Sequence, residues 1–291
     1  MGLNSLNFSS CKGQEQRNKL ALASVGAFTA GKYLPTFIQL PINGLFLESM
    51  SKISRTLPKD TVEIVNKNAQ KVLDEVTDLS SKGVKIIDCK NIGLPTPKAN
   101  TLCEKISNYI SSLLNPLIGT QTGKNACFSF DTNEIIYRKE KMSLAAFHEI
   151  GHAHNKFHSK FWRAIQKSRR PLSIIPLAIT AFVAFTKNSK PENGQELTVI
   201  QKTKNFIRNH AEIFAFASTI PALAEEITAS VKGCKWANKL LDKNLAKKVL
   251  KSNILGGITY LSIGGITALS VHIAKKIKDN AVAKQEASTN T

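Results

Sequence analysis

Acidic residues are scarce in this sequence. Asp and Glu number 21 against 40 Lys and Arg in 291 residues, which gives a formal net charge of +19 and a pI near 9.8. This balance excludes an acidic disordered tail and an acidic cation buffer. It indicates nucleic acid or an anionic membrane surface as a partner. Because 42% of the residues are hydrophobic and the mean hydropathy is −0.12, we expect a folded core rather than a chain made mainly of membrane spans.

Cysteine is also scarce. The sequence has an odd number of cysteines, and no two have C-x-x-C spacing: Cys11, Cys89, Cys103, Cys127 and Cys234. A disulfide framework and a cysteine zinc site are therefore not expected, and we predict free, mostly buried thiols in a reducing compartment. A secretory signal peptide is not expected either, because the first apolar stretch, Leu20 to Ala30, follows a polar segment and lacks a clear cleavage site.

Charged residues are missing from two long segments. Pro171–Thr186 and Ser252–Ala274 contain no Asp, Glu, Lys or Arg, and Phe206–Ala224 is nearly as apolar. As a helix rising about 1.5 Å per residue, 252–274 would reach roughly 35 Å, enough to cross a bilayer. We predict that 252–274 is a membrane helix and that 171–186 and 206–224 form an apolar helical hairpin, with buried helices as the alternative.

Periodicity and turn formers predict the remaining elements. We expect helices over 60–80 and 101–114, a strand over 84–88, a β-hairpin over 125–138, and a helix capped by Ser143. Residues 1–19 are polar and expected to be loose. Residues 20–50 are apolar but carry Gly31, Pro35, Pro41 and Gly44, which predicts short helices.

These elements predict a mainly α fold with a small β-hairpin or sheet (α+β). Four consecutive regions are expected: a polar and apolar N-terminal segment over 1–57, a catalytic region over 58–170, the apolar hairpin with a following helix over 171–232, and a basic linker, last membrane helix and polar tail over 233–291.

The motif that carries chemistry is H-E-x-x-H, formed by His148, Glu149 and His152. Histidines four apart project from one face of a helix and can grip one zinc ion, with the Glu in reach of the water on it. Zinc lowers the pKa of that water, and Glu149 acts as general base for attack on a carbonyl. The alternative is a helix with solvated histidines. Tyr137 and His210 are further candidates to stabilise an oxyanion, each with a structural role as the alternative.

A catalytic zinc needs a third protein ligand. His158 extends the motif to H-E-x-x-H-x-x-N-x-x-H, with Asn155 where metzincins have Gly. Metzincins also need a methionine turn downstream, and the only methionines, Met1, Met50 and Met142, precede the motif. This absence counts strongly against a metzincin and leaves His158 as one candidate among several.

The other candidates are Glu225 and Glu226, in the segment Leu223 to Ser230. The layout resembles membrane gluzincins of the HtpX and CAAX prenyl protease type, in which two apolar segments follow the H-E-x-x-H helix and an E-x-x-A-D helix supplies the third ligand. Residues 226–229 match the E-x-x-A part. Ser230 replaces the Asp, whose expected role is to orient a ligand imidazole.

The resemblance covers about residues 120–232 and implies a zincin-like catalytic region that binds Zn²⁺. By resemblance, His148, His152 and Glu226 are the metal ligands and Glu149 is the catalytic base, with Glu225 as the alternative ligand. Residues 125–126 and the hairpin after them would form an edge strand that holds an extended polypeptide substrate by backbone pairing. The first 100 residues resemble no family.

Basic residues cluster on both sides of the apolar hairpin, over 156–170 and 232–251. If the hairpin crosses a membrane, both clusters and the zinc site lie on one side, which the excess of positive charge predicts to be cytoplasmic. Because the loop 187–204 also carries lysines, a shallow, non-spanning hairpin is the alternative.

These observations predict a membrane-associated zinc endopeptidase. Its expected partners are a polypeptide substrate and anionic membrane lipid, whereas nucleic acid is not expected. Two alternatives stay open. One is a soluble, basic, DNA-associated zinc protease, and the other is a non-catalytic membrane protein with a vestigial H-E-x-x-H motif.

Overall fold

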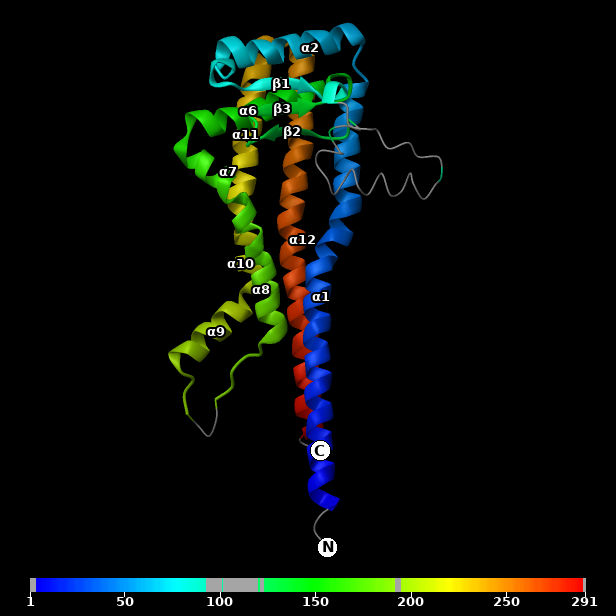
Figure 1. Ribbon diagram of the computed structural model, residues 1–291, viewed down its shortest axis with the longest axis vertical. Helices are drawn as coiled ribbons and strands as arrows, with labels where there is room; N and C mark the ends of the chain where they lie inside the picture. Colours follow the sequence, from blue (N-terminus) through cyan, green and yellow to red (C-terminus); the bar gives the residue numbers. More distant parts are fainter. Residues whose placement is uncertain (1–3, 93–100, 102–119, 121–122, 192–194, 290–291) are drawn as a thin grey trace. The chain divides into compact units, whose positions relative to one another are not determined.

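The computed structural model describes residues 4–92, 101, 120, 123–191 and 195–289. Helices make up most of these residues, and one three-stranded sheet is the only β-structure among them, which confirms the predicted mainly α fold with a small sheet (Figure 1). The chain forms two compact units, each built from segments far apart in sequence. The first unit comprises 1–38, 170–220 and 263–291, and the second comprises 39–169 and 221–262.

The described elements follow one another in this order: α1 (Asn4–Arg55), α2 (Lys59–Lys71), a π-helical turn η1 (Val72–Val76), 3₁₀ turn η2 (Ser80–Lys82), β1 (Lys85–Asp88), 3₁₀ turn η3 (Cys89–Ile92), β2 (Ala126–Ser129), β3 (Glu134–Tyr137), α5 (Lys139–Met142), 3₁₀ turn η4 (Ser143–Ala145), α6 (Ala146–His158), α7 (Lys160–Leu172), α8 (Ile174–Phe185), α9 (Val199–Asn209), α10 (Ala211–Ala217), α11 (Ile220–Leu240) and α12 (Lys243–Thr289).

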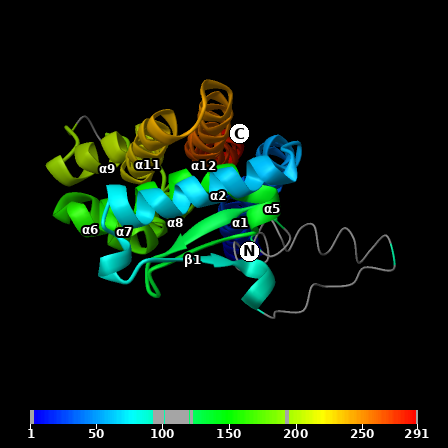
Figure 2. The same ribbon diagram turned by 90° about the horizontal axis from the view of Figure 1, so that it is seen from above.

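The sheet of the second unit has the order β1-β3-β2, with β1 parallel and β2 antiparallel to β3. The predicted hairpin over 125–138 and the strand over 84–88 are thereby confirmed. Asn133 adopts a left-handed φ of 62° in the hairpin turn, a conformation that Asn tolerates better than most residues. Central strand β3 is the most buried, and β2 lies at a sheet edge, with α2 running alongside the strands (Figure 2).

Helix α6 packs against β2 and β3 because its apolar side chains face the core. Phe147 and Ile150 of α6 are fully buried in one cluster with Val65 of α2, Ile135 of β3 and Val249 of α12. Burial of a side chain of this size contributes about 1.5–3 kcal/mol relative to exposure. This core fixes the side of α6 that faces the sheet.

Four local predictions need correction. The chain is helical without interruption from Asn4 to Arg55, so neither a loose 1–19 nor short helices over 20–50 are observed. Packing within the first unit overrides the local signals. A Cβ on Gly31 would lie 2.5 Å from Thr180 Cγ2 and 2.9 Å from Ala274 Cβ, so this glycine permits close helix contact.

The helix predicted over 60–80 instead ends at Lys71 and continues as a π turn. Helix α6 begins at Ala146 after a 3₁₀ turn, and the Ser143 side chain does not cap it. The helix predicted over 101–114 lies almost entirely outside the described residues.

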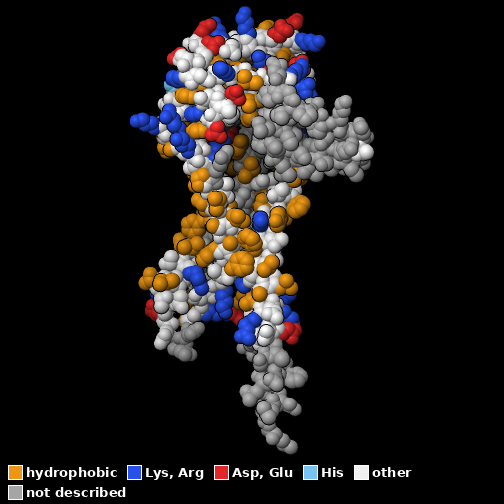
Figure 3. All heavy atoms as spheres, in the orientation of Figure 1, with side chains coloured by type: hydrophobic (Ala, Val, Ile, Leu, Met, Phe, Trp, Pro, Cys, Tyr) orange, Lys and Arg blue, Asp and Glu red, His pale blue; other side chains and the backbone are white. Residues whose placement is uncertain are grey.

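The apolar segments differ from one another in length. Segment 252–274 lies within α12, the one described helix that is by itself long and apolar enough to cross a membrane. Helices α7 and α8 pass the same test only as a pair bent by 48°. The predicted segment 206–224 is divided among α9, α10 and α11. Figure 3 shows hydrophobic side chains gathered on one face of the molecule. Large hydrophobic side chains of the first unit are exposed, including Leu22, Phe37, Phe185 and Leu269.

Helices α6 and α11 cross with their backbones in contact. A Cβ on Gly151 of α6 would lie 2.3 Å from the carbonyl oxygen of Ala229. A Cβ on Gly233 of α11 would lie 2.6 Å from the carbonyl oxygen of Phe147. Only a residue without a side chain fits at either position, because backbone atoms cannot move aside as a flexible side chain can.

Replacing Gly151 by Ala should therefore destabilise the protein by about 1–3 kcal/mol through overpacking. Gly265→Ala is the matched control, since α12 has open space around that position and Ala favours the helix. Urea unfolding of the purified variants measures the difference. Equal stability of the two variants would contradict the crossing.

Candidate metal centre

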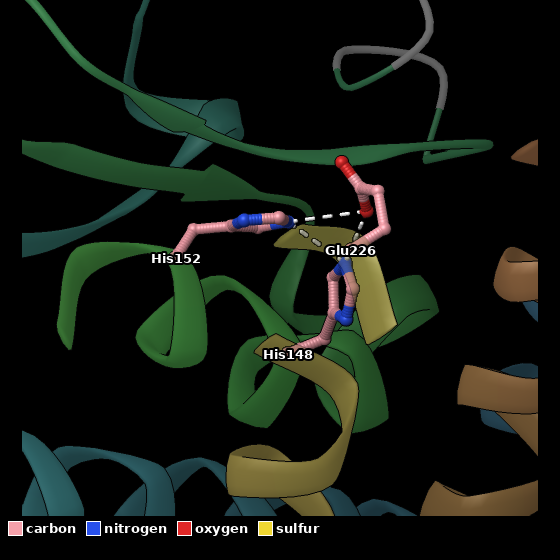
Figure 4. A group of neighbouring side chains, drawn as sticks. All are labelled: His148, His152 and Glu226. Atoms are coloured by element: carbon pink, nitrogen blue, oxygen red, sulfur yellow. Dashed lines mark hydrogen bonds and ion pairs between the residues drawn. The ribbon is translucent and has the colours of Figure 1, made fainter. Parts of the chain in front are cut away.

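Three side chains from two helices converge at one point in the second unit (Figure 4). His148 and His152 lie one turn apart on α6, and Glu226 projects from α11. The histidine Nε2 atoms are 2.9 Å apart, and Glu226 Oε2 lies 3.2 Å from that of His148 and 3.3 Å from that of His152. Ligands at about 2.0–2.1 Å from a tetrahedral zinc ion lie roughly 3.3 Å apart, so the spacing is close to that of a zinc site.

The contacts of the two histidine Nδ1 atoms show that the Nε2 atoms are the ones that face this point. His152 Nδ1 lies 3.0 Å from Glu225 Oε1. An ionised carboxylate only accepts, so Nδ1 carries a proton, and Nε2 of the neutral ring, the form that binds a metal, presents a lone pair. His148 Nδ1 lies 3.0 Å from Ser230 Oγ, and donation to that hydroxyl likewise leaves Nε2 as an acceptor. Three acceptors then face one another, an arrangement that a cation stabilises.

The charge around this point favours a divalent cation. Glu149, Glu225 and Glu226 are buried carboxylates, and Arg169 is paired with the last two. When all three carboxylates are ionised and both histidines are neutral, as in a metal-bound site, one guanidinium leaves two negative charges in this group. Burial acts to lower the pKa of His152, but Glu226 and Glu225 outweigh it and raise that pKa well above its ordinary value. The donor set and its charge therefore fit Zn²⁺.

Glu225, the alternative third ligand, contacts other groups. Its Oε1 accepts hydrogen bonds from His152 Nδ1, from Asn155 Nδ2 at 2.8 Å and from Gln166 Nε2 at 2.7 Å. Its Oε2 is paired with Arg169 Nη2. Burial acts to raise the pKa of Glu225, but His152 and Arg169 outweigh it and lower the pKa to about 2. Both oxygens are occupied, and Glu225 orients His152 from outside the cluster.

Ser230 contacts a histidine of the cluster. Its hydroxyl lies one turn beyond Glu226 on α11 and 3.0 Å from His148 Nδ1. A hydroxyl can orient an imidazole as a carboxylate does, but it adds no negative charge. Ser230 therefore orients His148 without adding charge to the site.

His158, the other candidate ligand, lies outside the cluster. Its Nε2 accepts a hydrogen bond from Lys82 Nζ at 2.6 Å, and its ring stacks on His154 with centroids 4.2 Å apart. Burial and Lys82 lower the pKa of His158. A histidine that faces a lysine is poorly placed to bind a cation, so α11 rather than the end of α6 brings the third donor to His148 and His152.

Two residues at the cluster are not identifiable from the sequence. Arg169 Nη2 donates to Glu226 Oε1 at 2.7 Å, and the Tyr260 hydroxyl also hydrogen-bonds the Glu226 carboxylate. Arg169 is one of many cations in a basic segment, and Tyr260 is one polar side chain in an apolar run, so no local sequence pattern identifies either residue.

The two residues that the sequence suggests for stabilising an oxyanion have other places in the structure. Tyr137 donates to Asn66 Oδ1 at 2.9 Å, and His210 belongs to the first unit.

Glu149 lies beside the cluster in a small cleft that His148 also lines. The cleft has a volume of about 20 Å³, which is room for about one water molecule. Burial raises the pKa of Glu149, against the opposing effect of the two histidines, and the backbone N–H of Phe128 in β2 donates to its carboxylate. A carboxylate with a raised pKa is suited to accept and return a proton near neutral pH.

Comparison of the chain with protein-family models, curated proteins and solved structures finds no match.

Zinc content should depend on the cluster and not on His158. We expect one zinc per chain in the wild type and in His158→Ala, and well under one in His152→Ala and Glu226→Ala, because each of these loses one of three ligands. Metal analysis after dialysis against a weak chelator provides the measurement. Loss of zinc from His158→Ala, or its retention in Glu226→Ala, would show that Glu226 is not the third ligand.

Proposed function

We propose that the protein is a membrane-associated, zinc-dependent endopeptidase. The observation that carries the proposal is the convergence of His148, His152 and Glu226, whose ligand atoms all lie within 4.8 Å of one another. Glu149 lines the cleft at the same point. Two imidazoles, a carboxylate ligand and a second carboxylate as base are the groups that zinc-dependent hydrolysis of a peptide bond requires.

Zinc held by these residues would polarise the substrate carbonyl and lower the pKa of water. Glu149 takes the proton of the attacking water, whose oxygen bonds to the carbonyl carbon. The same carboxyl then gives the proton to the amide nitrogen as the carbon–nitrogen bond breaks. The products are a carboxylate and an amine, so no further reactant is needed.

The surrounding residues keep these groups in position. Glu225 orients His152, Ser230 orients His148, and Arg169 engages the second oxygen of Glu226. With Oε1 bound to Arg169, Glu226 offers Oε2 as a single donor atom. Such outer contacts typically change metal affinity or activity by roughly 10–100-fold when they are lost.

A polypeptide is the proposed substrate. Strand β2 lies at the edge of the sheet, and its first residue, Ala126, lines the cleft beside His148 and Glu149. An extended peptide paired with this edge would lie next to the base. The resemblance to HtpX and CAAX prenyl protease gluzincins, in which an edge strand precedes the zinc helix, supports the same reading.

The proposed location is a membrane, with the zinc site facing the cytoplasm. Helix α12 is long and apolar enough to cross a bilayer, and large apolar side chains of the first unit are exposed. Lysines flank the apolar part of α12, which favours contact with anionic lipid headgroups.

Glu149→Gln should lower peptidase activity by about 10²–10⁴-fold, because the amide cannot accept the proton of water. Zinc content should be unchanged, since Glu149 is not one of the three ligands. The exposed Glu63→Gln is the control for loss of one carboxylate. Equal activity of wild type and Glu149→Gln on a proteome-derived peptide mixture would instead favour a vestigial motif.

Membrane attachment predicts how the protein fractionates. The protein should stay with the membrane pellet in 1 M salt and in alkaline carbonate, and should be released by detergent, because apolar burial is insensitive to screening. Release by salt alone would favour the soluble, DNA-associated protease.

A further inference from the structure

We infer that α9 is an interfacial helix, which lies in the surface of the membrane where α12 leaves the bilayer and turns its apolar face to lipid. The inference rests on the proposed membrane location and adds to it a second element that binds lipid. It is carried by two observations within the first unit, the reversed polarity of α9 and its contacts with the residues that follow the apolar part of α12.

Helix α9 turns its polar face toward the protein. Residues three and four apart share one face of a helix, and the residues of α9 that are not exposed follow this spacing and are all polar: Gln201, Lys204, Asn205 and Arg208. Arg208 is fully buried, and its guanidinium donates to the carbonyl oxygens of Val183 and Thr186 at the end of α8, at 3.2 and 3.3 Å. Asn205 exchanges two hydrogen bonds with the backbone of Ser189. These contacts fix the rotation of α9.

The other side of α9 carries large apolar side chains that are exposed. Val199 is 79% exposed, Ile200 82% and Phe206 56%, and Ile207 is exposed as well. A surface helix of a protein in water has the reverse arrangement, with its apolar stripe against the core and its polar face outside. The arrangement of α9 therefore indicates an apolar medium outside the protein.

Contacts with α12 fix the level at which α9 lies. Arg208 Nη2 is paired with Asp279 at 2.8 Å, and Lys275 Nζ donates to the carbonyl oxygen of Asn209 at 3.2 Å. Lys275 is the first charged residue after the proposed span over 252–274, and Asp279 lies about one turn further along the helix. Charged residues that directly follow a span lie among the lipid headgroups. The end of α9 is therefore at the level of the headgroups.

The length and direction of α9 favour a helix in the plane of the membrane over one that crosses it. With 11 residues, α9 rises about 16 Å, whereas the hydrocarbon core of a bilayer is about 30 Å thick. Figure 1 shows α9 oblique to α8, the helix before it, rather than continuing along it. A capping box of Thr198 and Gln201 begins α9, so its first turn is formed without a partner from another element.

Photolabelling at two depths tests the inference. The full chain is reconstituted in vesicles of phosphatidylcholine and phosphatidylglycerol that contain a phospholipid with an aryl diazirine, placed either next to the glycerol or at the end of an acyl chain. Mass spectrometry locates the modified residues. The glycerol-level probe should modify Val199, Ile200 and Phe206 but not the protein-facing Asn205. The acyl-end probe should modify the exposed Leu261 of α12 and no residue of α9.

Each other outcome has a distinct meaning. Modification of α9 by the acyl-end probe would place the helix in the bilayer core and overturn the inference. If α12 is modified and α9 is modified by neither probe, α9 contacts water or another protein, which overturns the inference and leaves the membrane location intact. If α12 is not modified either, the proposed membrane location fails as well.

A substitution on the apolar face tests the same contact. Ile200→Asn should lower the glycerol-level modification of Val199 and Phe206 about fivefold, because the amide favours withdrawal of α9 from lipid. Ile64→Asn is the matched control, since Ile64 of α2 is also an exposed isoleucine on a helix and belongs to the second unit. It should leave that modification unchanged. An equal decrease with both variants, or no decrease with Ile200→Asn, would overturn lipid contact through this face.

Discussion

The candidate site depends on the close crossing of α6 and α11. Because Gly151 and Gly233 bring the two backbones into contact, the side chains of α11 reach the face of α6 that carries His148 and His152. A larger residue at either glycine would separate the helices and withdraw Glu226 from the histidines. Gly151, the second x of H-E-x-x-H, is thus constrained by packing, whereas the His and Glu positions of the motif are constrained by chemistry. Helix α6 is in turn held by the apolar core that it shares with the sheet and α2, so this core fixes the positions of His148 and His152.

Glu225 and Glu226 show why sequence reasoning left the third ligand open. Consecutive helical residues project about 100° apart, so only one of the two can face a given point, and the sequence does not give the rotation of the helix. In the structure Glu226 faces the histidine Nε2 atoms, while both oxygens of Glu225 are bound by His152, Asn155, Gln166 and Arg169. The two glutamates therefore have complementary positions, one inside the cluster and the other behind an imidazole.

Local patterns predicted the local features. Helical spacing placed both histidines on one face of α6, and turn formers placed the β2–β3 hairpin, because each depends on residues near in sequence. Features set by distant partners were missed. Arg169 is one of many cations in its segment until the fold brings it to Glu226, and α1 runs through Pro35 and Pro41 although proline disfavours helix interiors. Near these prolines, at Gly31, the helix packs closely against Thr180 and Ala274, which are far away in sequence and enter no local pattern.

The strong positive charge of the chain contrasts with the acidity of its candidate site. A cluster of buried carboxylates in a chain of net charge +19 needs its counter-charges within hydrogen-bond distance, because screening by solvent weakens distant lysines. Arg169 supplies one such charge, and a divalent ion on His148, His152 and Glu226 would supply the rest. Lys247, Lys248 and Lys251, which precede the apolar part of α12, lie outside that balance, whereas Lys275 is paired with Glu212 and Lys278 is buried against Ser24. The candidate site is therefore compensated locally, and the excess of positive charge lies elsewhere on the chain.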